Sequence, residues 1–167
     1  HMPPQSTLDW VAGQFGRTER VVRVRRLRNA FAAAMHAIDV DDGAGTRHEL
    51  VMRRWVRADT PPDPGAVENE SSALTLLGSS AAAAVVAPAL VVADAGAVSA
   101  DVPAVVMTRL VGRDTLAPID LDGYLDGLVD TLHAIHAVPV PAEVELEMYR
   151  PWGLERLTEP PPWTHHR

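Results

Sequence analysis

The feature that most restricts the fold is a series of short segments in which apolar and polar residues alternate. Such segments occupy Glu19–Leu27, Phe31–Val40 and His48–Val56, and the turn-forming sequence DDGAG separates the last two. Alternation with a period of two is typical of strands that bury one face, and a glycine-containing turn between two strands favours a hairpin. The pattern therefore predicts an antiparallel three-stranded meander, and a short helix over Ser6–Gly16 is predicted before it.

The segments after the meander predict another helix, two strands and a long helix. Apolar residues at helical spacing, followed directly by a glycine, indicate a helix over Ala66–Leu77. Short apolar segments predict strands at Ala89–Ala93 and Val102–Thr108, and a leucine and isoleucine stripe predicts a helix over Ile119–Val138. This order of elements predicts an α+β fold, in which a five-stranded antiparallel sheet packs against one helix.

Composition narrows the possible partners. The 167 residues carry a net charge of -7, which argues against general binding to nucleic acid or to an anionic membrane surface and favours a small or cationic partner. The longest apolar stretch is interrupted by Pro88, Asp94 and Gly96, so it does not predict a membrane span. The absence of cysteine excludes disulfides and thiolate metal sites, and it favours a reducing cytoplasm.

The basic residues are all arginine, since the sequence has no lysine. Together with abundant alanine, this bias is typical of a GC-rich bacterial genome. Any role that requires a fixed cation must therefore be filled by a guanidinium, which stays charged and binds oxygen atoms through a planar fork.

Two adjacent arginines, Arg53 and Arg54, interrupt an otherwise apolar strand and must point to opposite faces of the sheet. On the following helix, Glu70 shares the apolar face with Val67 and Leu74, whereas Glu68 does not. A carboxylate on an inward face is costly unless it is paired, so we predict a Glu70 ion pair with Arg53. The alternative is that Glu70 reaches solvent and that both arginines extend from an edge strand into water.

Four segments, in this order, resemble the amino-terminal lobe of the aminoglycoside phosphotransferase family, the bacterial relatives of protein kinases. They are DGAGTRHELVMRRW, ENESSALTLL, VPAVVMTRLVGR and LVDTLHAIHAVP. The resemblance implies a kinase-like amino-terminal lobe over residues 1–109 and a hinge with the first helix of the carboxy-terminal lobe over residues 110–138. The proline-rich residues 139–167 are then expected to end before the catalytic loop, as a piece of a longer protein would.

The resemblance also implies roles for individual residues. Arg53 corresponds to the strand cation that holds the nucleotide's phosphates, Glu70 to the carboxylate that orients it, and Arg54 is then a surface residue. Val51 lies on the nucleotide-facing strand and Met107 flanks the adenine. The backbone carbonyl of Thr108 and the backbone N–H of Leu110 are expected to bind the adenine edge.

Two departures from the family pattern affect the expected activity. The segment Leu27–Ala37 has no glycine where the family commonly places a Gly-Gly pair, which puts phosphate binding by residues 29–33 in doubt. The sequence also has no His-Gly-Asp catalytic loop and no later magnesium-binding Asp, so no catalytic or metal-binding residue is assigned in this chain. His133 and His136 are interpreted as helix-packing residues rather than metal ligands, and the carboxylates of the hairpin as a solvated turn: Asp39, Asp41 and Asp42.

The function expected from this reasoning is that of the nucleotide-binding lobe of a small-molecule phosphotransferase. With Mg²⁺, the parent would transfer the γ-phosphoryl group of ATP or GTP to a hydroxyl of an aminoglycoside-like or other small acceptor, and this piece alone would be inactive. A pseudokinase, or a non-catalytic binding module with a degenerate phosphate loop, remains an alternative. An unrelated α+β binding domain would leave Arg53 and Glu70 apart.

Overall fold

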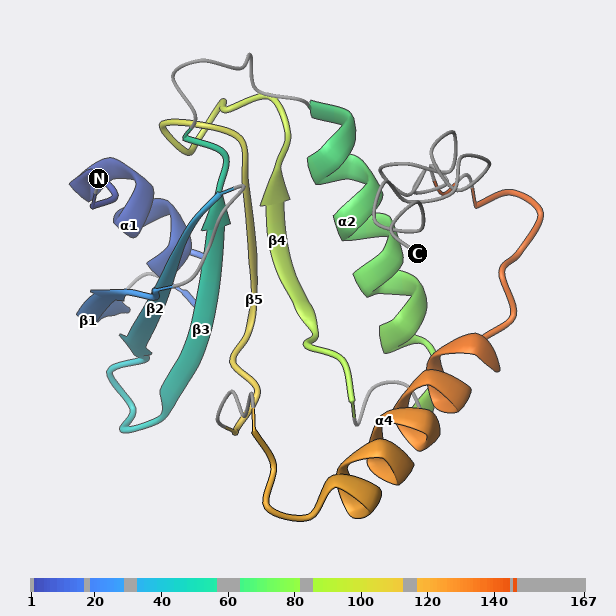
Figure 1. Cartoon of the computed structure of the whole chain (residues 1–167). Helices are drawn as coiled ribbons and strands as arrows, with labels where there is room; N and C mark the ends of the chain where they lie inside the picture. The colour runs from blue at the N-terminus through green and yellow to red at the C-terminus, as the bar shows by residue number, and fades with distance from the viewer. Residues whose placement is uncertain are drawn as a thin grey trace, which may run out of the picture.

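The computed structural model describes residues 2–16, 19–28, 33–56, 64–81, 86–112, 117–144 and 146. In this part of the chain, five antiparallel strands form one sheet in the order β1-β2-β3-β5-β4, which confirms the predicted α+β fold (Figure 1). The strands are β1 (Arg20–Arg26), β2 (Ala34–Asp41), β3 (Arg47–Arg54), β4 (Leu90–Asp94) and β5 (Ala104–Thr108). The helices are α1 (Gln5–Ala12), α2 (Pro64–Gly78) and α4 (Leu121–His136).

The turn between β2 and β3 has the chemistry that its sequence predicts. The Asp42 carboxylate accepts hydrogen bonds from the backbone N–H groups of Ala44 and Thr46, each at 2.9 Å. Gly43 and Gly45 have φ angles of 71° and 97°, which residues with a side chain rarely adopt. The turn therefore sets the β2–β3 register, in which Asp41 lies opposite Arg47.

Helices cover both faces of the sheet. On one face, α1 packs through Val11 against a core from three central strands: Ile38, Val40, Leu50, Met52 and Val106. On the other face, α2 packs through Val67 and Leu74 against Val105 and Met107 of β5. Figure 1 shows α1 and α2 on opposite sides of the strands. Because α1 covers the face opposite to α2, a charged side chain of β3 on that face is also buried.

The long helix α4 forms at the predicted leucine stripe, but it has no buried residue. Asp120 caps its first turn by accepting a hydrogen bond from the Gly123 N–H at 3.0 Å. His133 and His136 are exposed, so their interpretation as packing residues was wrong. Across the described residues, no helix is both long and apolar enough to cross a membrane.

Candidate functional site

The structure brings Arg53 and Glu70 together. The Nη1 atom of Arg53 on β3 donates a hydrogen bond to Oε2 of Glu70 on α2, at 3.0 Å. The side chains are 34% and 21% exposed, and the Arg53 guanidinium also lies 4.9 Å from the centre of the Trp55 ring. The predicted pair is confirmed, and the alternative in which Glu70 reaches solvent unpaired was wrong.

The surroundings of Glu70 favour its neutral form more than water does. Burial raises the pKa of the Glu70 carboxyl group, and the Arg53 guanidinium opposes this shift through its charge and its hydrogen bond. Arg53 is therefore the group that favours the ionised form of this half-buried carboxyl. In return, Glu70 restricts where the guanidinium can point.

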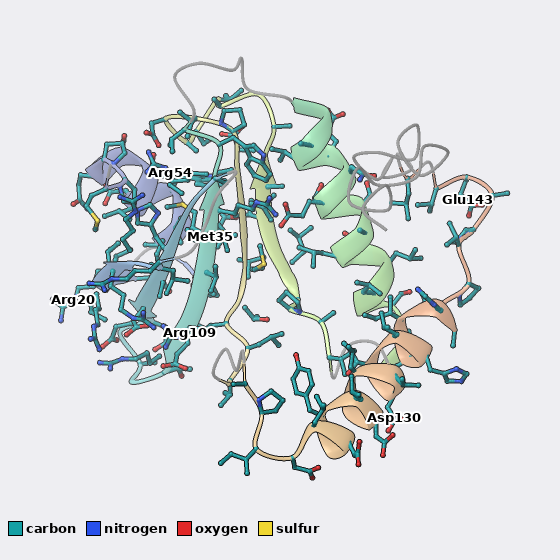
Figure 2. The ribbon with its side chains drawn as sticks, in the orientation of Figure 1. Arg20, Met35, Arg54, Arg109, Asp130 and Glu143 are labelled. Carbon is teal, nitrogen blue, oxygen red and sulfur yellow. The ribbon has the colours of Figure 1, made fainter. Side chains whose placement is uncertain are left out.

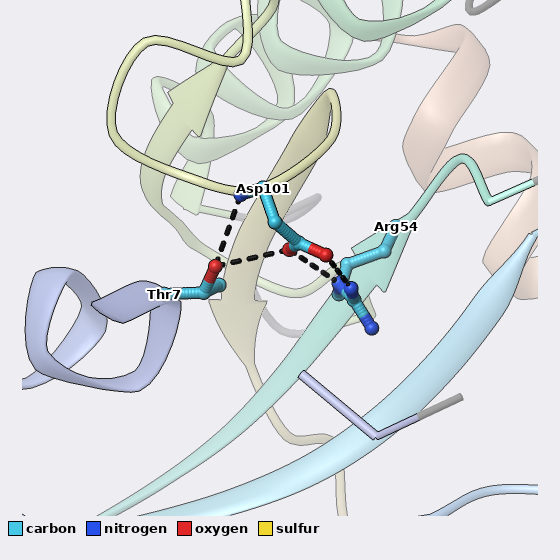
Figure 3. A network of polar contacts seen from close by, with 3 residues as sticks. All are labelled: Thr7, Arg54 and Asp101. Atoms are coloured by element: carbon cyan, nitrogen blue, oxygen red, sulfur yellow. Dashed lines mark hydrogen bonds and ion pairs between the residues drawn. The ribbon is translucent and has the colours of Figure 1, made fainter. Parts of the chain in front are cut away.

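Arg54 is buried, which corrects its assignment as a surface residue. It is only 1% exposed, and its Nε atom donates to Oδ1 of Asp101 at 3.2 Å, while Nη2 forms an ion pair with Oδ2 (Figure 3). Thr7 of α1 completes the network: its hydroxyl donates to Oδ1 of Asp101 and accepts from the Asp101 N–H, both at 3.0 Å. Arg54 thus connects the sheet to α1 and to the β4–β5 loop.

His36 lies on the same covered face as Arg54. It is fully buried, opposite Met52 on β3, and neither ring nitrogen has a hydrogen-bond partner among the residues that the structure describes. Burial lowers the pKa of His36 to about 4, assisted by the positive charge of Arg54. The imidazole is therefore neutral at physiological pH, as a neighbour of a buried guanidinium must be.

A cleft of about 830 Å³ opens on the α2 side of the sheet, within the size range of small-molecule sites. Its lining includes four of the residues predicted to contact a nucleotide: Val51, Met107, Thr108 and Leu110. Arg53 and Glu70 are outside the lining, but Met35, which lines the cleft, lies directly opposite Arg53 in the β2–β3 ladder. Five of the six predicted residues belong to the sheet or its continuation, and Glu70 on α2 reaches one of them, Arg53.

The segment after β5 forms one wall of this cleft. The Thr108 N–H donates to the Ala89 carbonyl at 2.9 Å, and the Arg109 N–H donates to the Glu49 carbonyl at 2.9 Å. Within the described part of the chain, no protein acceptor takes the Leu110 N–H. This leaves a backbone donor at the cleft, as the adenine-edge prediction requires.

Sequence reasoning missed the ion pairs of Arg109. This residue lines the cleft, and its guanidinium reaches Oδ1 of Asp39 at 3.0 Å and also pairs with Glu49. Asp39 is 5% exposed, so the interpretation of its carboxylate as part of a solvated turn was wrong. In Figure 2, Arg109 lies lower on the sheet than Met35. The apolar–charged alternation around Asp39 did not signal its partner, which is 70 residues away.

A model of the phosphotransferase enzyme family, APH, matches residues 16–167. The chain belongs to this family. A comparison with curated proteins found no match, and a comparison with solved structures found none either. Members of the APH family transfer phosphoryl groups, and the family in general uses a nucleotide and a metal.

The described residues fit a nucleotide better than they fit a metal ion. The apolar base of the cleft and the guanidiniums near it are suited to a nucleotide, whose base is flat and whose phosphates are anionic. By contrast, the described residues contain no group of three or more His, Asp or Glu side chains placed to hold a metal ion. None of the described residues of this APH chain is therefore assigned to a metal site.

Proposed function

We propose that this chain forms the nucleotide-binding part of an APH phosphotransferase, which transfers the γ-phosphoryl group of ATP or GTP to a hydroxyl of a small acceptor. The observation that carries the proposal is the Arg53–Glu70 ion pair beside the cleft. In phosphoryl transfer, positioning and neutralisation of phosphate charge supply most of the catalysis. A guanidinium held at a known position by a carboxylate on a neighbouring helix is suited to that task.

The ion pair is accessible enough to act on a ligand. With 34% of its side chain exposed, Arg53 can present a guanidinium edge to a phosphate while Nη1 stays bound to Glu70. Arginine binds phosphate oxygens through two parallel hydrogen bonds, and it cannot lose its proton near neutral pH. The role of Glu70 is to orient the guanidinium, and the role of Arg53 is to hold phosphate.

The base of the nucleotide would occupy the apolar end of the same cleft. Val51 on β3 and Met107 on β5 lie directly opposite one another and form its floor. Leu110, which is 51% exposed, adds an apolar edge and a backbone N–H that is suited to a ring nitrogen of the base. These contacts would exclude water from the flat faces of the base and fix its orientation.

In the proposed reaction, an acceptor hydroxyl oxygen bonds to the γ-phosphorus while the bond from that phosphorus to the β–γ bridging oxygen breaks. A nucleoside diphosphate and a proton are released. The 167 residues contain no His-Gly-Asp sequence to receive that proton, so the role proposed for this chain is binding and orientation of the donor.

The residues would divide into a lobe over 1–109, a hinge with one helix over 110–138, and a tail over 139–167. An aminoglycoside-like acceptor would suit the net charge of -7.

The test is a titration of the full chain with Mg-ATP and Mg-GTP, followed by thermal unfolding and by calorimetry. A ligand that binds only the folded state must raise the unfolding temperature as its concentration increases. We expect a rise with millimolar nucleotide, and a weaker rise for Arg53→Ala than for the control Arg20→Ala. The absence of any rise for the unmodified chain would contradict the proposed function and favour a module that no longer binds nucleotide.

A further inference from the structure

The cleft has a second charged feature that the family assignment does not explain. The carboxy-terminal end of β1 contributes Arg25 and Arg26 to its lining, Arg28 follows directly after this strand, and none of the lining residues is acidic. This is unusual in a chain with 22 acidic and 15 basic residues. The fourth arginine of the lining, Arg109, is already paired with Asp39 and Glu49. Among the described residues, no ion pair neutralises Arg25 or Arg28.

The strand register places Arg25 on the cleft face of the sheet. Arg25 lies opposite Ala37, Ala37 lies opposite Val51, and Val51 lies opposite Met107. Side chains directly opposite each other in antiparallel strands share a face, so this row crosses the sheet on the α2 side. Arg26 lies opposite His36 and so belongs to the other face. Arg28 follows the end of β1 and is exposed.

The two ends of the cleft therefore differ in chemical character. At one end, Met107, Leu110 and Pro88 give an apolar surface beside the segment that follows β5. At the other end, two strands away from Val51, the exposed guanidiniums of Arg25 and Arg28 provide positive charge. A ligand with a flat apolar group at one end and several negative charges at the other matches this arrangement.

Small Ala37 lies between the two ends and has almost no exposed surface, so no bulky side chain from β2 separates them at that row. The sequence from Leu27 to Ala37 contains no glycine, and a glycine-rich loop is the usual means of bringing backbone N–H groups to phosphate oxygens. Side-chain cations next to the cleft offer a different means of binding the same oxygens.

Building on the function proposed above, we propose that Arg25 and Arg28 hold the polyphosphate tail of the nucleoside triphosphate through their side chains. The base then lies toward Met107 and the tail lies toward β1, with Arg53 on the same face of the sheet. The competing explanation is that these arginines only protect the edge strand β1 from pairing with another chain. That explanation assigns the same role to Arg20, which is exposed on the same strand but does not line the cleft.

The experiment first compares three forms of the 167-residue chain: the unmodified chain, the double variant Arg25→Ala/Arg28→Ala and the control Arg20→Ala. Calorimetric titration with Mg-ATP, inorganic tripolyphosphate and adenosine separates tail binding from base binding. We expect the double variant to lose roughly tenfold or more in affinity for Mg-ATP and for tripolyphosphate, since each arginine supplies charge-assisted hydrogen bonds. We expect adenosine affinity to stay unchanged, and Arg20→Ala to match the unmodified chain for all three probes.

The outcomes distinguish the inference from the function on which it rests. If the unmodified chain binds none of the probes, the proposed function fails. If it binds Mg-ATP and the double variant binds equally well, the function stands and the arginine assignment is wrong. An equal loss for adenosine and Mg-ATP would also overturn the assignment, because the arginines would then act through the fold. The double variant Arg25→Lys/Arg28→Lys, which keeps the charge, should recover much of the Mg-ATP affinity and the same salt dependence.

Discussion

Replacing either of the two adjacent arginines of β3 should reduce stability, and the loss should be larger for Arg54 than for Arg53. This is the reverse of the order expected from the sequence, which assigned Arg54 to the surface. Arg54→Ala removes a guanidinium that is 1% exposed and leaves the Asp101 carboxylate, which also accepts a hydrogen bond from the Thr7 hydroxyl, without its cationic partner. Breaking a buried ion pair costs about 3–5 kcal/mol. Because the Asp101 side chain is 31% exposed and can be rehydrated, we expect a loss near the lower limit, about 3 kcal/mol.

Arg53→Ala should cost much less. Its side chain and that of Glu70 are 34% and 21% exposed, so solvent screens the pair, and exposed pairs contribute about 1 kcal/mol or less. For a chain of this length, 1 kcal/mol corresponds to about 2–4 °C in unfolding temperature. We therefore expect a decrease of about 6–12 °C for Arg54→Ala and of a few degrees for Arg53→Ala.

Urea unfolding followed by circular dichroism would measure both free energies. Arg54→Met is a matched control that keeps most of the side-chain volume and removes only the charge and the donors. A double-mutant cycle with Asp101→Ala should give a coupling energy of a few kcal/mol for Arg54, and close to zero for Arg53. Equal losses for Arg53→Ala and Arg54→Ala would refute the assignment of the two side chains to differently covered faces.

Two further predictions concern the same covered face. The pKa of His36 is lowered from 6.5 to about 4 by burial and by the Arg54 and Arg26 charges, against the opposing charge of Asp101. Its stabilising contribution is therefore complete above pH 6.5 and is lost as pH falls toward 4, by about 3 kcal/mol in total. His36→Leu should flatten the pH dependence of unfolding in that window; an unchanged slope would show that the imidazole does not titrate there. Thr7→Val should cost about 1–2 kcal/mol and speed amide hydrogen exchange in α1 (Gln5–Ala12), since the buried hydroxyl makes two hydrogen bonds to Asp101; unaltered exchange would contradict the anchoring of α1.

The sheet, the hairpin turn and the Arg53–Glu70 pair could be predicted because local spacing determines them. Alternation along β3 places Arg53 and Arg54 on opposite faces, and helical spacing places Glu70 on the apolar face of α2. The two elements follow one another closely in the chain, with the paired residues 17 positions apart. Such short-range relations are visible in a single sequence.

The burial of Arg54 could not be predicted in the same way. Alternation shows that two side chains face opposite sides, but it does not show which side another element covers. The cover comes from α1, and its Thr7 meets Asp101 across 94 positions of sequence. Asp39 has a similar explanation: β2 is central and buried on both faces, so its pattern of exposure does not alternate. Both errors come from contacts between distant segments.

The most direct test of nucleotide binding at the cleft is methyl NMR of the full chain, with and without Mg-ATP. Methyl groups of Val51, Met107 and Leu110 line the cleft, whereas those of Val11 and Val40 belong to the α1-covered core. The account predicts saturable chemical-shift changes at the first three and none at the last two. Shift changes confined to the α1 face, or none at millimolar Mg-ATP, would contradict it.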